Sequence, residues 1–79
     1  MRKKIYMDAK YVGANSLDPY YYPKNETRTI CVRYYLFSRR ITVWRVQGWR
    51  NCEIPGTRLE YPNIQAFATD FERVKVHAV

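Results

Sequence analysis

The chain has 79 residues, of which 47% are apolar and 16% aromatic, and its 14 Lys and Arg against 7 Asp and Glu give a formal net charge of +7. This composition excludes a linker or a disordered tail and predicts one domain over residues 1–79. Its core is thin, since a chain this short buries only about 60% of its unfolded surface. The charge favours partners that carry phosphate or carboxylate groups, unless it serves only to keep the chain soluble.

The N-terminal segment is expected to be neither an export signal nor a membrane span, because Asp8 and Lys10 interrupt any apolar run after the basic opening. We therefore expect a cytoplasmic, reducing environment in which Cys31 and Cys52 are free thiols that fill small spaces in the core. Two cysteines and one histidine, His77, are too few for a zinc site, and the sequence has no glycine-rich phosphate loop. No metal and no cofactor are expected.

The first predicted element is a half-buried strand over residues 4–12, because apolar and polar residues alternate there with a period of two. Its predicted buried face carries Ile5, Met7, Ala9 and Tyr11.

A loop over residues 17–25 follows, stiffened by Pro19 and Pro23. It carries three consecutive tyrosines, Tyr20, Tyr21 and Tyr22. Neighbouring side chains point apart, so we expect at least one ring to be exposed and available to a partner. The alternative is a loop that uses its rings only to cover the core.

A β-hairpin is predicted next, because residues 27–37 and 41–49 are rich in β-branched and aromatic residues and residues 38–40 can form a turn. One predicted face of its first strand carries Ile30, Val32, Tyr34 and Leu36, and the other carries Cys31, Arg33, Tyr35 and Phe37.

The turn sequence leaves two strand registers open. A two-residue turn places Arg33 opposite Trp44 on the outer face of the hairpin. A three-residue turn buries Trp44 against Tyr34 and sets Arg33 opposite Arg45. We favour the three-residue turn, which buries more aromatic area although it brings two like charges together.

The last third of the chain predicts a turn over residues 54–57, a short strand over 58–61, a helix and a closing strand. Asn63 is the expected helix N-cap. The apolar residues that follow it repeat at helical spacing and are Ile64, Phe67, Ala68, Phe71 and Val74. Near Arg73 the period changes to two, which predicts a strand from Val74 to Val79. The order β-β-β-(β)-α-β predicts an α+β fold, a small and mostly antiparallel sheet with one helix packed on it.

The segment between Glu26 and Glu53 contains no acidic residue and holds six arginines. Arginine presents a planar fork that meets phosphate or carboxylate through two hydrogen bonds, and interleaved aromatic rings can stack on bases or anchor a protein interface. The alternative is that the arginines are only solvated and that the rings fill the core. The predicted binding residues are Arg28, Arg33, Tyr35, Arg39, Arg40, Arg45, Trp49 and Arg50, with Tyr20, Tyr21 and Tyr22 as a second candidate group.

These features favour a non-catalytic protein that binds nucleic acid, a nucleoprotein complex or an acidic protein surface, and not a membrane. It could contact nucleic acid directly or act by occlusion, as phage-encoded anti-CRISPR proteins do, an analogy that rests only on size, solubility and the lack of a recognisable active site. The alternative is a small basic ribonuclease of the toxin kind, using the arginines with His77 and Glu60 or Glu72. A homodimer through an edge strand is also possible.

Overall fold

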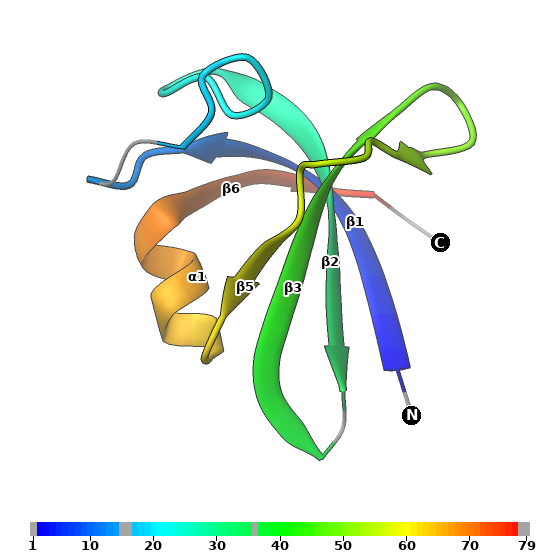
Figure 1. Cartoon of the computed structure of the whole chain (residues 1–79), viewed down its shortest axis with the longest axis vertical. Coiled ribbons are helices and arrows are strands. Elements are labelled where there is room, and N and C mark those ends of the chain that lie inside the picture. The colour runs from blue at the N-terminus through cyan, green and yellow to red at the C-terminus, as the bar shows by residue number, and fades with distance from the viewer. Residues whose placement is uncertain (1, 15–16, 36, 78–79) are drawn as a thin grey trace.

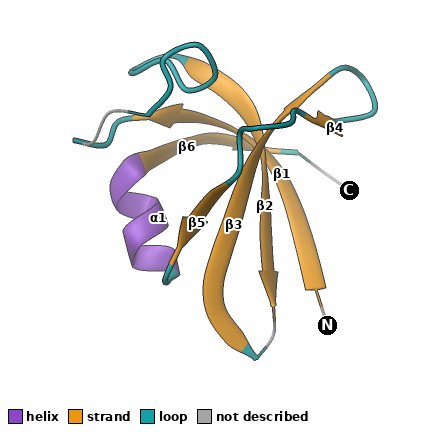
Figure 2. Cartoon of the chain, viewed as in Figure 1, coloured by secondary structure: helices purple, strands orange, loops and turns teal. Residues whose placement is uncertain are grey.

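The computed structural model describes residues 2–14, 17–35 and 37–77, without the side chain of Arg2. Within these ranges the elements in chain order are β1 (Arg2–Tyr11), β2 (Thr27–Tyr35), β3 (Ser38–Gln47), β4 (Cys52–Glu53), β5 (Leu59–Tyr61), α1 (Ile64–Asp70) and β6 (Phe71–Val76). The predicted α+β class is confirmed, since these strands form an antiparallel sheet and the helix packs on it (Figures 1 and 2).

The sheet has the strand order β4-β3-β2-β1-β6, with β5 also paired to β3. β4 pairs with the end of β3 at Val46 and Gln47, whereas β5 pairs with its first half at Ile41–Val43. Both short strands therefore lie on the side of β3 that faces away from β2. Among the described strands β6 is the edge beside β1, and a bulge shifts its register between Asp8 and Ala9.

One face of the sheet, the inner face, carries the core. The buried face predicted for the first strand is correct, because Met7, Ala9 and Tyr11 are buried and Ile5 packs against them. The same core includes side chains from β2, β3, β5, α1, β6 and the tyrosine loop: Ile30, Val32, Ile41, Val43, Tyr61, Phe67, Phe71 and Tyr22. Ring contacts join Phe67 and Phe71, whose centroids are 5.2 Å apart.

The hairpin turn and both predicted registers are wrong. Ser38 already pairs with Tyr35 and belongs to β3, so the turn comes earlier than residues 38–40. Trp44 lies opposite Cys31 on the outer face, and Arg33 lies opposite Thr42. This register turns Ile41 and Val43, which have no polar side-chain group to satisfy, toward the core. Leu36, predicted to share a face with Ile30, Val32 and Tyr34, lies outside the described residues.

The predicted helix begins where expected but ends earlier. The Asn63 side chain accepts a hydrogen bond from the backbone of Ala66, which confirms the N-cap. The helix stops at Asp70, because Phe71 is extended and pairs with Tyr11 as the first residue of β6. Val74, counted in the helical stripe, lies on β6 and is 53% exposed. The last two residues of the predicted closing strand, 78 and 79, lie outside the described residues.

Candidate functional site

The six arginines of the acid-free segment do not share one surface. Residues paired across antiparallel strands lie on the same face of the sheet. Arg28 is paired with Ala9 and Arg45 with Ile30, which places both arginines on the inner face. The inner face also holds Arg39, whereas Arg33 and Arg40 lie on the outer face and Arg50 on the turn between β3 and β4.

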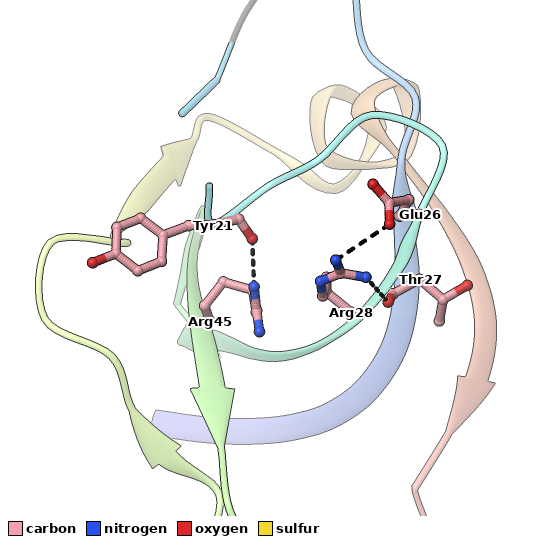
Figure 3. A network of polar contacts seen from close by, with 5 residues as sticks. All are labelled: Tyr21, Glu26, Thr27, Arg28 and Arg45. Atoms are coloured by element: carbon pink, nitrogen blue, oxygen red, sulfur yellow. Dashed lines mark hydrogen bonds and ion pairs between the residues drawn. The ribbon is translucent and has the colours of Figure 1, made fainter. Parts of the chain in front are cut away.

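Two of the inner arginines make polar contacts within the fold, and one of them, Arg45, joins the tyrosine loop to the sheet (Figure 3). Arg45 Nη1 donates to the Tyr21 carbonyl and Nε donates to the Thr29 carbonyl at 3.3 Å. Burial lowers the pKa of the Arg45 guanidinium, and the charge of Arg28 lowers it further. Arg28 donates to the Thr27 carbonyl at 2.8 Å and pairs with Glu26 at 3.4 Å. Arg28 and Arg45 are thus already engaged within the fold.

The tyrosine loop divides its three rings as expected, with at least one exposed. Tyr22 is buried and its hydroxyl donates to the Thr57 carbonyl at 2.6 Å. Burial raises the pKa of Tyr22 to about 12. Tyr21 is half-buried and meets the edge of Tyr20, with ring centroids 4.9 Å apart, and Tyr20 is 80% exposed. Only Tyr20 offers most of its ring to a partner.

Arg33 is engaged on the outer face. Its guanidinium lies over the Trp44 ring, 5.5 Å from the centroid, and pairs with Glu53 of β4. Arg33 Nε and Trp44 Nε1 are buried in this cluster and have no hydrogen-bond partner among the described residues. The ion pair joins β2 to β4 across the intervening strand β3, so it helps to hold β4 on the sheet.

Three of the remaining predicted residues, Tyr35, Arg39 and Arg40, lie near the tip of the hairpin. We call this surface the hairpin end, and it consists of Lys3, Lys4, Tyr35, Phe37, Arg39 and Arg40. Phe37 is 95% exposed and Tyr35 is 47% exposed. Arg39 makes no hydrogen bond or ion pair with any described residue, and Arg40 pairs with Glu60 at 2.9 Å yet keeps 73% of its side chain exposed.

Lys3, Lys4 and Phe37 were not among the predicted site residues. The register of β1 against β2 places Lys3 opposite Tyr34 and Lys4 opposite Arg33, which brings both lysines next to the hairpin tip. Figure 1 shows the start of β1 and the tip of the β2–β3 hairpin at the same end of the molecule. The basic opening of the chain was visible in the sequence, but its strand partner was not.

Trp49 and Arg50 lie at the other end of β3, on the turn that leads to β4 (Figure 1). Trp49 is 86% exposed, and the Arg50 guanidinium lies 4.6 Å from its ring centroid. These two residues are therefore a separate exposed group that does not extend the hairpin end.

The ribonuclease alternative combined His77 with Glu60 or Glu72, but the hydrogen-bond partner of His77 is Asp8. His77 Nε2 lies 2.9 Å from Asp8 Oδ1, and the same oxygen accepts a hydrogen bond from Thr29. That hydrogen bond from Thr29 is the main reason why the pKa of Asp8 lies below its ordinary value. Cys31 is a buried free thiol, as predicted, whereas Cys52 is exposed and is not a core residue.

No group of three His, Cys, Asp or Glu side chains that could hold a metal ion occurs in the described part of the chain. Over the same residues no helix is long and apolar enough to cross a membrane.

Comparison with protein-family models, with curated proteins and with solved structures finds no match to this chain.

Proposed function

We propose that this protein is a non-catalytic, cytoplasmic binder of single-stranded nucleic acid, with little dependence on base sequence, and that the hairpin end is its contact surface. The single observation that carries the proposal is the combination of Phe37 at 95% exposure with four cationic side chains on the same end of the sheet. Of the cations, only Arg40 has a carboxylate partner among the described residues.

The chemistry of the hairpin end matches that of an unpaired strand. A flexible backbone of phosphates can bend to meet cations at several angles, and Lys3, Lys4, Arg39 and Arg40 supply them from two elements at one end of the sheet. Unpaired bases offer flat faces, and exposed rings such as Tyr35 and Phe37 can stack on them. An exposed phenyl ring has no such partner on the outside of a duplex, which favours single strands.

The test compares two exposed aromatic residues at opposite ends of β3. Fluorescence anisotropy with oligo-dT or oligo-U of about 12 nucleotides measures the affinity of the native chain, Phe37→Ala and Trp49→Ala. Loss of a stacked base costs about 1–3 kcal/mol, so we expect Phe37→Ala to bind about 5-fold to 150-fold more weakly and Trp49→Ala to bind as the native chain does. Equal weakening by both variants, or no binding of either oligonucleotide at low salt, would refute the proposal.

The same samples test the ribonuclease alternative. Electrophoresis of the oligo-U after incubation shows whether the RNA stays intact, as a binder requires. Cleavage of the RNA by the native chain, and its loss in His77→Ala, would establish catalysis instead.

A further inference from the structure

A second surface of the molecule is an open apolar groove on the inner face of the sheet. Its volume is about 940 Å³, and it lies between α1 and the first halves of β1 and β3 and the second half of β2. Val32 and Ile41 lie buried at its base, and the more accessible Ile5 of β1 and Ile64 and Ala68 of the helix line it. Ile64 is 54% exposed, and Ala68 is exposed as well.

The groove exists because the helix is short. Seven residues span only about 10 Å of helix, whereas ten residues of strand reach about 30 Å. α1 contacts β3, β5 and β6, and the part of the inner face that approaches the hairpin tip extends beyond it (Figure 1).

The charged residues of the groove are all positive. Arg39 of β3 and Arg73 of β6 line it, and none of its described lining residues is Asp or Glu. Neither guanidinium makes a hydrogen bond or ion pair with a described residue. An occupant that matches this surface has an apolar side for the apolar lining and carboxylates for the two arginines.

The strands under the groove offer side chains and little free backbone. β2 pairs with both β1 and β3, and β3 also pairs with β5, so their backbone groups are used within the sheet. An extended segment laid on this face would have to leave its own peptide groups without partners. A helix satisfies its backbone internally and needs only side-chain contacts.

We infer that the groove is a docking site for an amphipathic, acidic helix of a partner protein, which lies beside α1 with its apolar side on Ile5, Ile64 and Ala68 and its carboxylates toward Arg39 and Arg73. This site goes beyond the nucleic-acid surface and shares only Arg39 with it.

The test selects peptides from a displayed library of helices of about 15 residues. Each peptide has leucines on one side, and its flanking positions vary among Glu, Gln and Lys. We expect the native chain to enrich peptides with Glu over Lys at the flanking positions. A lack of enrichment, or enrichment of Lys, would overturn the inference.

Matched variants place the selected peptide on the molecule. Ala68→Glu puts a carboxylate into the groove, whereas Thr69→Glu makes the same change of charge at an exposed neighbour that does not line it. We expect the affinity for the peptide to fall at least about tenfold in Ala68→Glu and to stay unchanged in Thr69→Glu. Equal effects of the two variants would overturn the inference.

Two substitutions on β6 test whether the positive charge that lines the groove attracts the peptide. Arg73→Ala is expected to weaken the peptide about threefold or more, and Lys75→Ala, which removes an exposed cation outside the groove, is expected to have no effect. Equal weakening by the two variants would show a non-specific charge effect and overturn the inference.

Two further measurements separate the other possible occupants. If the groove is not part of the nucleic-acid surface, Ala68→Glu binds oligo-dT with the same affinity as the native chain. Loss of this affinity in Ala68→Glu would assign the groove to nucleic acid. Sedimentation velocity measures the oligomeric state of the native chain and of Ala68→Glu. A dimer for the native chain and a monomer for Ala68→Glu would assign the groove to a second copy of this chain. Either result would overturn the inference, whereas failure of Phe37→Ala to affect oligo-dT would count only against the nucleic-acid proposal.

Discussion

Arginines of identical charge have different roles in this molecule, because the fold gives them different surroundings. Arg45 is half-buried and donates to the carbonyls of Tyr21 and Thr29, and Arg33 is held by Glu53 over Trp44. Arg39 is exposed and has no partner among the described residues. The sequence shows six equivalent arginines, and only the register and the loop position distinguish them.

Substitution of Arg45 is expected to lower stability rather than only binding. Hydrogen bonds from a charged group contribute about 1.5–3 kcal/mol, and their loss leaves two carbonyls without this partner. We expect Arg45→Ala to lower the free energy of unfolding by about 2–3 kcal/mol in urea titrations. Arg39→Ala is the matched control and should change it by less than about 0.5 kcal/mol. Similar losses in both variants would contradict these separate roles.

The pKa of Asp8 is expected to depend on Thr29. The hydrogen bond from the Thr29 hydroxyl stabilises the charged carboxylate, so Thr29→Val should raise the pKa of Asp8 toward the ordinary value of an aspartate. Because the folded-state pKa is lowered, the stabilising effect is present above the unfolded-state pKa and is lost as the pH falls through the folded-state value. Carboxyl NMR titration of both proteins measures this shift, and an unchanged Asp8 pKa would contradict it.

At the scale of elements, the strand patterns and the helix cap were predictable, whereas the connections between elements were not. The alternation from Ile5 to Tyr11 and the Asn63 cap depend on residues close in sequence. The hairpin register depends on a bulge between Tyr34 and Tyr35, which no turn signature announces. The helix end depends on Phe71 pairing with a strand that precedes it by 60 residues. Such long-range pairings override local periodicity.

The tyrosine loop is expected to limit stability at alkaline pH. Burial raises the pKa of Tyr22 to about 12 from the ordinary tyrosine value of about 10, so its neutral form stabilises the fold below pH 10 and that effect is lost as the pH rises toward 12. Burial also raises the pKa of Tyr61, which donates to Asp70 and acts in the same direction. We expect Tyr22→Phe to reduce the loss of stability between these pH values, as followed by circular dichroism. An unchanged alkaline transition in Tyr22→Phe would contradict this role.

At the scale of the molecule, the charge of +7 is distributed unevenly after local pairing. Three arginines of the segment that the sequence presented as purely basic have carboxylate partners, because Arg28 pairs with Glu26, Arg33 with Glu53 and Arg40 with Glu60. The hairpin end holds three cations without a carboxylate partner among the described residues, Lys3, Lys4 and Arg39, and other such cations, including Lys10, Lys24 and Lys75, lie elsewhere on the molecule. Composition predicted an anionic partner for the whole chain, but the location of the surface required the pairing of strands far apart in sequence.

The salt dependence of oligo-dT binding tests the central claim most directly. The slope of log K against log salt concentration, between about 50 and 200 mM, reports the number of phosphate contacts at about 0.7 each for single strands. The double variant of Arg39→Ala with Arg40→Ala should make this slope about 1.4 units less steep, since it removes two contacts. Arg50→Ala with Arg58→Ala removes the same charge outside the hairpin end and should leave the slope unchanged. Equal changes of slope in the two double variants would contradict a phosphate-binding surface at the hairpin end.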